Sequence, residues 1–197
     1  MAITAAQVRN LREQTGAGMM DCKRALEATG GDEAKAIAHL RQQGLAAAAR
    51  REGRATKEGV VIAYVHAGGK IGVLVEVNCE TDFAARTDAF EELAKNLAMQ
   101  VAATNPRWLS REEIPQEVLE QEREIYRARA AQEGKPENVL DRIVEGRVNK
   151  FFEEFCLLEQ SFIRDPDVKI TELVAETGAK VNENVVVRRF VRFQMGQ

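Results

Sequence analysis

Two runs rich in β-branched residues constrain the fold of this chain more than any other feature. They lie in VVIAYVHAGGKIGVLVEVNC, residues 60–79, and the tetrapeptide AGGK separates them. Glycines between two such runs are typical of a β-hairpin, because glycine tolerates the backbone angles of tight turns. A single hairpin is not stable alone, so the rest of the chain must cover one of its faces.

The segments that follow the hairpin are mostly helical by their apolar spacing. Residues 87–103 carry Phe90, Leu93, Leu97 and Val101 at helical intervals, and NPRW ends that helix. SREE, residues 110–113, matches a capping box ahead of a helix from Pro115 to Gly134. We expect a second charged helix with Pro136 as an early residue, a turn around Asp165 and Pro166, a helix over ITELVAETG, and a final strand over NENVVVRRFVRF.

The first 44 residues predict three short helices. Thr4 and Gln7 match a capping box, and Val8 and Leu11 form one apolar face. The glycines in TGAG and GGD interrupt the helical pattern, Asp32 is a candidate N-cap, and Gly44 suits a C-terminal stop.

Residues 45–57, LAAAARREGRATK, lack a strong apolar stripe and are typical of a helical linker. We therefore predict an N-terminal three-helix domain with its linker over residues 1–56 and a core over residues 57–197. The predicted fold class is α+β, with a small antiparallel sheet packed with helices.

The charge balance argues against a dedicated nucleic-acid binder. Lys and Arg number 28 and Asp and Glu 31, which gives a net charge of −3 rather than a basic excess. Cys22, Cys79 and Cys156 are odd in number and far apart, so neither a disulfide framework nor a zinc site is expected. Without a signal-peptide pattern or a long apolar stretch, the chain is expected to be cytoplasmic, with no membrane segment.

No motif of the sequence meets the requirements of catalysis. GAG at residues 16–18 lacks the third glycine of a dinucleotide fingerprint, because Asp21 stands there. No nucleophile elbow occurs, and His39 and His66 are isolated. We therefore expect neither enzymatic activity nor a cofactor or metal.

Two pairs of residues are not needed by the fold. Met19 and Met20 are neighbours on a helix and cannot both face one small core, so one should point outward or both should lie in a seam between domains. Asp82 and Phe83 follow the second β-branched run. The residues alone favour an ordinary interpretation, in which Asp82 caps a turn and Phe83 anchors the core.

Three segments resemble one known family. LREQTGAGMMDCKRALEATGGDEAKAIAHLRQQG at residues 11–44 and GVLVEVNCETDFAAR at residues 72–86 resemble the signature segments of bacterial elongation factor Ts, and NENVVVRRF at residues 182–190 resembles its C-terminal strand. The length resembles the short form of the family.

The resemblance implies a guanine-nucleotide exchange factor for elongation factor Tu. In the family, a Thr-Asp-Phe-Val segment enters the nucleotide domain of the partner and disturbs its magnesium site. Thr81, Asp82 and Phe83 match that segment, whereas Ala84 stands where valine is commoner. The resemblance also assigns partner docking to the N-terminal helices, including Leu11, Met19 and Met20, and implies a homodimer.

The alternative is an RNA-binding module. It would use the basic run from Arg50 to Lys57 with Trp108, or the C-terminal strand in which Arg188, Arg189 and Arg192 alternate with Phe190 and Phe193. The acidic total argues against this alternative, so no direct nucleic-acid partner is expected.

Overall fold

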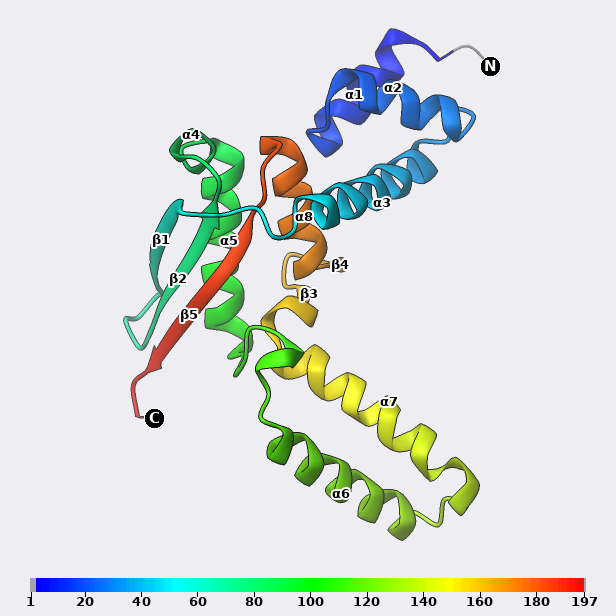
Figure 1. Ribbon diagram of the computed structural model, residues 1–197, viewed down its shortest axis with the longest axis vertical. Coiled ribbons are helices and arrows are strands. Elements are labelled where there is room, and N and C mark those ends of the chain that lie inside the picture. Colours follow the sequence, from blue (N-terminus) through cyan, green and yellow to red (C-terminus); the bar gives the residue numbers. More distant parts are fainter. Residues whose placement is uncertain (1–2, 197) are drawn as a thin grey trace. The chain divides into compact units, whose positions relative to one another are not determined.

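The three-dimensional structure is a computed structural model that describes residues 3–196 (Figure 1). The chain forms two compact units. The first holds Met1–Ile62, Val75–Asn96 and Glu172–Arg188, and the second holds Ala63–Leu74, Leu97–Thr171 and Arg189–Gln197. The division at residue 56 that composition suggests stays a prediction.

Three helices open the first unit, as predicted. They are α1 (Ala5–Thr15), α2 (Met19–Ala28) and α3 (Glu33–Arg51). Thr4 and Gln7 form the expected capping box, and the Asp32 side chain caps α3 by accepting a hydrogen bond from the Lys35 amide. The small core of these helices consists of Val8, Leu11, Cys22, Ala25, Leu26 and Ala36.

The predicted stop at Gly44 is wrong. Helix α3 continues through this glycine to Arg51 and ends only before the glycine turn at Gly53. The alanines that follow Gly44 are strong helix formers, and they offset the cost of one glycine inside the helix. Gly44 is buried, and a Cβ placed on it would lie 4.0 Å from the Ala179 Cβ. An added Cβ would therefore make only an ordinary contact, and Gly44 is a buried position within the helix rather than its end.

The hairpin and the last strand form one sheet, as predicted. Its strands β1 (Glu58–Val65), β2 (Ile71–Cys79) and β5 (Val186–Gln194) are antiparallel in the order β1-β2-β5. Strand β2 buries Val73, Val75, Val77 and Cys79 at alternate positions, so one face of it belongs to the core.

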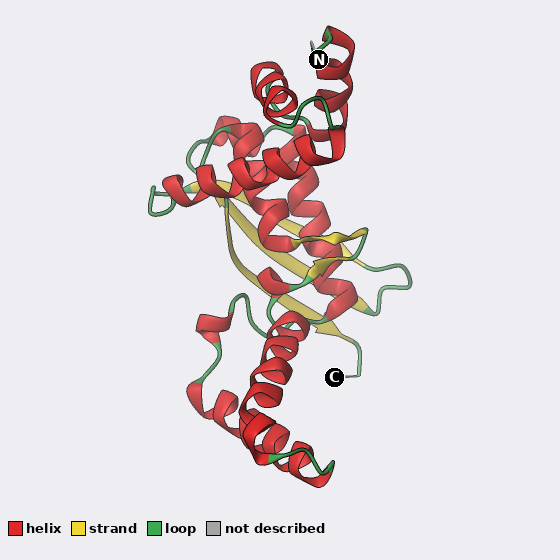
Figure 2. Ribbon diagram, turned by 90° about the vertical axis from the view of Figure 1, so that its right-hand side faces the viewer, coloured by secondary structure: helices red, strands yellow, loops and turns green. Residues whose placement is uncertain are grey.

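Helices complete the core around the sheet (Figure 2). Helix α5 (Asp88–Thr104) buries a stripe with helical spacing that includes Phe90, Leu93, Leu97 and Val101. A short helix, α4 (Asp82–Ala85), precedes it, and α8 (Ile170–Val181) precedes β5. The predicted α+β class is thereby confirmed.

In the second unit, α6 (Gln116–Gln132) and α7 (Glu137–Phe155) form an antiparallel pair. Their shared core holds Ile114, Val144, Val148, Phe151, Phe152 and Cys156. Trp108 packs on this core with its ring centroid 5.8 Å from that of Phe151. Pro136 is the N-cap of α7 and so stands just before the helix rather than inside it.

Two local expectations in this unit are wrong. Ser110 makes no side-chain capping bond, and SREE leads into a 3-10 turn, η1 (Arg111–Glu113), because the Glu113 carboxylate accepts from the Leu109 amide instead. The turn expected around Asp165 and Pro166 lies at residues 163 and 164 instead, and Asp165 and Pro166 begin a strand. The turn joins β3 (Ser161–Phe162) to β4 (Asp165–Lys169) in a small hairpin, which follows a second 3-10 turn, η2 (Leu157–Glu159).

Buried Gln100 explains why the small hairpin forms without a β-branched run. Its side chain donates to the Ser161 carbonyl at 3.1 Å and accepts from the Ile163 amide at 2.9 Å. These long-range bonds supply the backbone partners that a two-residue strand lacks.

Within residues 3–196, no helix is both long and apolar enough to cross a lipid bilayer. Cys22, Cys79 and Cys156 are buried free thiols.

Candidate functional site

The strongest candidate site is the turn that joins β2 to α4. Thr81 is the N-cap of α4, and its hydroxyl accepts a hydrogen bond from the Ala84 amide. Its backbone is extended, with φ −130° and ψ 157°, as is usual for an N-cap residue, and the helical turn begins at Asp82. The turn carries Asp82 and Phe83 immediately after the buried end of the strand.

Phe83 is exposed, which corrects the interpretation of this ring as a core anchor. Its fractional exposure is 79%, although the next two residues, Ala84 and Ala85, are buried. Burying a phenylalanine ring is worth roughly 1.5–3 kcal/mol, and the fold leaves that gain unused. An exposed ring that is followed by buried residues is therefore available to a partner.

Asp82 lies beside the ring and pairs with Arg86, one helical turn away, at 2.8 Å. Both side chains are largely exposed, so this ion pair contributes little to stability. The ion pair places one negative and one positive side chain beside Phe83. Asp82 is not a buried acid of the kind that transfers protons in catalysis.

A second turn, over residues 182–184, holds the Phe83 turn in place. The Glu183 carboxylate accepts hydrogen bonds from the amides of Glu80 and Thr81, each at 3.0 Å, and from the Thr81 hydroxyl at 2.6 Å. Sequence reasoning missed Glu183, because it treated NEN only as the start of the last strand. Pairing across 102 residues leaves no signal in local spacing.

Buried Cys79 lies beneath the turn. Its thiol donates to the Thr81 carbonyl at 3.1 Å. Burial, followed by the nearby Glu183 carboxylate, raises the pKa of Cys79 to about 11. The thiol is thus neutral and serves as a small apolar group with one hydrogen bond.

The predicted docking residues of the N-terminal helices differ in exposure. Met19 and Met20, in the first turn of α2, are 48% and 60% exposed, whereas Leu11 is fully buried in the three-helix core. Both methionines are thus available to a partner, and neither is in a closed seam. Leu11 supports the helices from within.

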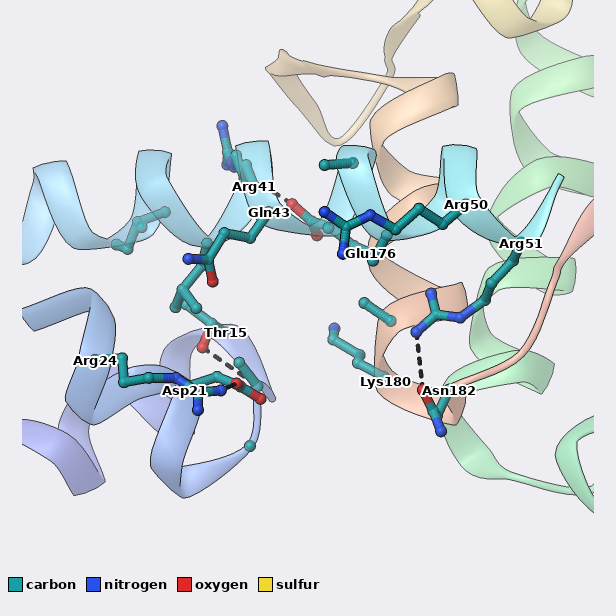
Figure 3. A pocket seen from close by; sticks show the side chains of 18 of the residues that line it. Thr15, Asp21, Arg24, Arg41, Gln43, Arg50, Arg51, Glu176, Lys180 and Asn182 are labelled. Atoms are coloured by element: carbon teal, nitrogen blue, oxygen red, sulfur yellow. Dashed lines mark hydrogen bonds and ion pairs between the residues drawn. The ribbon is translucent and has the colours of Figure 1, made fainter. Parts of the chain in front are cut away.

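The first unit also contains a cavity of about 680 Å³ (Figure 3). Its cationic lining residues are Arg24, Arg41, Arg50, Arg51 and Lys180, and its acids are Asp21 and Glu176. Arg24 pairs with Asp21, Arg41 with Glu176, and Arg51 donates to Asn182. Most of this charge is therefore used within the fold.

The side chains proposed for RNA stacking are partly committed elsewhere. Trp108 is half-buried against Phe151, and the Arg192 guanidinium donates to the Ala102 carbonyl at the end of α5. These contacts weaken the RNA-binding alternative. Among the described residues, no group of three or more His, Cys, Asp or Glu side chains could hold a metal ion.

Comparison with known proteins decides the family. Residues 33–197 match the family model described as "Elongation factor TS". The chain belongs to the elongation factor Ts family. It is 60% identical over 195 residues to elongation factor Ts of Carboxydothermus hydrogenoformans, covering 99% of this chain and 90% of that relative.

Other relatives of elongation factor Ts agree. The protein from Thermoanaerobacter sp. strain X514 is 60% identical, with 99% of this chain and 96% of the relative covered. The protein from Geobacter sulfurreducens is 56% identical over 197 residues, with 100% and 91% covered. These relatives are little longer than this chain, as expected for the short form.

Membership in the elongation factor Ts family assigns the chain to protein biosynthesis in the cytoplasm, as a non-enzymatic nucleotide exchange factor for elongation factor Tu. The predicted function is confirmed at this level.

Proposed function

We propose that this protein promotes GDP release from elongation factor Tu by inserting Thr81, Asp82 and Phe83 beside the magnesium and nucleotide site of its partner. The observation that carries the proposal is the 79% exposure of Phe83 on a turn fixed by hydrogen bonds. A ring held outward on a fixed backbone enters a pocket at a small cost in conformational entropy.

The physical basis is competition between two binding reactions. GDP and Mg²⁺ are held by backbone amides around the phosphates and by oxygen ligands around the metal. The segment from Thr81 to Phe83, inserted beside these groups, binds best when they have moved. Nucleotide and exchange factor therefore weaken each other's binding to elongation factor Tu by the same ratio.

Phe83 alone does not supply the whole effect. Each tenfold change in affinity takes about 1.4 kcal/mol, and one buried ring yields roughly 1.5–3 kcal/mol. Additional contacts must hold the factor on its partner. The exposed Met19 and Met20 side chains suit this docking role, because methionine adapts to irregular apolar surfaces. Leu11 keeps α1 and α2 in the shape that presents them.

Ala84 does not extend the exposed part of this segment. It is buried, so the smaller side chain at this position removes bulk from the interior of the turn rather than from its exposed surface. The proposed contact with elongation factor Tu therefore rests on the ring, with Asp82 orienting the charge beside it.

A homodimer is the second part of the proposal. In the second unit, the exposed apolar side chains of the hairpin and of the C-terminal segment are Val65, Leu74, Val191, Phe193 and Met195, and we call this set the apolar patch. The Met195 amide donates to the Lys70 carbonyl at 2.9 Å, which ties the end of β5 to the hairpin loop. Exposed patches of this kind are typical of interfaces, and a second copy would cover it.

Release of a fluorescent GDP analogue from elongation factor Tu tests the exchange function. Adding the full chain should accelerate release in proportion to its concentration until the partner is saturated. Release at the spontaneous rate, at concentrations that form the complex, would contradict the proposal.

A further inference from the structure

The 182–184 turn, between α8 and β5, is bonded to the Phe83 turn in both directions. Glu183 accepts from the amides and hydroxyl described above. In return, the Glu80 carboxylate accepts from the Asn184 amide at 2.7 Å and from Arg54 at 3.3 Å. The Asn184 side chain donates to the Arg54 carbonyl at 3.2 Å, so the end of the linker joins the same network.

The backbone of the 182–184 turn is itself constrained. Asn182 has a φ of 58°, in the left-handed region that asparagine tolerates better than most residues. The Glu183 amide donates to the Gly178 carbonyl at 3.0 Å, which closes the end of α8. A Cβ on Gly178 would lie 2.9 Å from the Glu183 carbonyl oxygen, so glycine is needed for the turn to approach the helix.

The same turn is also tied to the end of α3. Arg51 donates through Nη2 to the Asn182 side chain at 2.8 Å (Figure 3). The other guanidinium nitrogen, Nη1, is buried without a protein partner. Helix α3 begins among the docking helices, where Ala36 belongs to their core, and ends at this contact. A continuous path of helix and hydrogen bonds thus runs from α3 through Asn182 and Glu183 to Thr81.

We propose that Glu183 is the positioning residue of the exchange site and that the Arg51–Asn182 contact couples α3 to it. The inference rests on the proposed role of Phe83. A helix of four residues such as α4 is not stable by itself, so its orientation depends on external bonds. Three of those bonds end on the Glu183 carboxylate. Its removal leaves the Phe83 turn to be ordered during binding, which slows insertion.

The first test compares Glu183→Ala with Glu183→Gln in the full chain. Glu183→Ala should lower the GDP release rate at saturating factor about tenfold, because the turn must then become ordered during insertion. The concentration of factor that gives half the maximal rate should change less than about threefold. Glu183→Gln keeps a carbonyl acceptor and should recover most of the rate. Glu52→Ala is the matched control, since Glu52 is exposed and its side chain makes no hydrogen bond or ion pair within residues 3–196.

Amide hydrogen exchange in the free protein supplies a readout that does not depend on the partner. The Glu80 and Thr81 amides should be protected in the wild type, exposed in Glu183→Ala, and partly protected in Glu183→Gln. Loss of protection without a slower GDP release would overturn the positioning role. A fall in the unfolding midpoint that accounts for the slower release, with no recovery in Glu183→Gln, would also overturn it.

A double-mutant cycle tests the coupling to α3. Arg51→Gln and Glu183→Ala should each reduce the GDP release rate. The fold-reduction in the double variant should be smaller than the product of the two single fold-reductions, because both substitutions act on one turn. Effects that multiply independently would overturn the coupling. Failure of the proposed function gives a different result from failure of the positioning role. If Phe83 has no role in exchange, Phe83→Ala leaves the GDP release rate unchanged, while the amide protection of Thr81 still depends on Glu183.

Discussion

Two exposed phenylalanines show how differently the two units present apolar surface. Phe83, in the first unit, is 79% exposed, and Phe193, in the second, is 68% exposed. Phe83 follows Asp82, which pairs with Arg86, and precedes two buried alanines, on a turn that is hydrogen-bonded to Glu183. Phe193 lies among other exposed apolar side chains along β5 and the hairpin. A single fixed ring suits insertion into a pocket, whereas a broad patch suits a flat interface.

The largest effect is expected from Phe83→Ala. The GDP release rate at equal concentration of factor should fall by about 10- to 150-fold, which corresponds to the loss of roughly 1.5–3 kcal/mol of ring burial. Stopped-flow release of a fluorescent GDP analogue measures it. Circular dichroism should be unchanged, because the ring makes no contribution to the core. A wild-type release rate for this variant would remove the distinction between the two rings.

Phe193→Ala is the reciprocal change. If the patch in the second unit is a dimer interface, loss of one large ring should weaken self-association by about tenfold or more. Sedimentation velocity over a range of concentrations measures this, and Phe83→Ala should sediment like the wild type. A monomeric wild type at micromolar concentration, or a slower GDP release from Phe193→Ala without dissociation, would contradict the assignment of the two surfaces.

Met19→Ala and Met20→Ala sharpen the comparison on the docking side. Each should raise the Kd for elongation factor Tu by about two- to tenfold, since truncating a contact outside an interface centre costs roughly 0.5–1.5 kcal/mol. Titration of labelled partner measures the Kd. Ile125→Ala is the control, because Ile125 is an exposed apolar residue of α6 that belongs to neither proposed surface. Equal effects from all three variants would mean that exposure of an apolar side chain alone, and not its place on α2, explains binding.

The next prediction concerns stability rather than exchange, through the buried thiols. Burial raises the pKa of both Cys79 and Cys156 to about 11, against an ordinary value of 9.0. Because the folded state favours the protonated thiols, their stabilising contribution is complete below pH 9 and is lost as the pH rises through about 11. Urea unfolding between pH 8 and pH 11 should show this decline, and Cys79→Ala should show a shallower one.

Thiol labelling compares the two units directly. Cys79 under the Phe83 turn should react as slowly as Cys156 in the α6–α7 core, because both are enclosed. Fast labelling of Cys79 alone would indicate that the Phe83 turn opens readily, and would argue against a fixed ring.

Local patterns predicted most of the fold, and they failed where distant residues decide. The hairpin, α5 and the capping box at Thr4 follow from spacing and turn chemistry within a few residues. The small hairpin at residues 161–169 depends on buried Gln100, and α3 continues through Gly44 to the glycine turn at Gly53. The dependence on Gln100 is not visible in the neighbouring sequence.

The site was predictable only in part for the same reason. Spacing alone favoured Phe83 as a core residue, and only the resemblance to elongation factor Ts pointed to an exposed ring. Glu183 was missed because its partners lie a hundred positions earlier in the chain. The exposure of Met19 and Met20 agrees with the geometric limit that adjacent residues on a helix cannot share one small core.

Because α3 continues past Gly44, one rigid helix connects the core of the first helices to the contact at Asn182. At 1.5 Å per residue, a helix of 19 residues is about 28 Å long. A tilt of about 10° at one end would therefore displace the other by about 5 Å, more than the reach of any single hydrogen bond in the network at Asn182. If elongation factor Tu binds the first helices as proposed, a tilt of α3 on binding would stretch the Arg51–Asn182 contact and so change the orientation of the Phe83 turn.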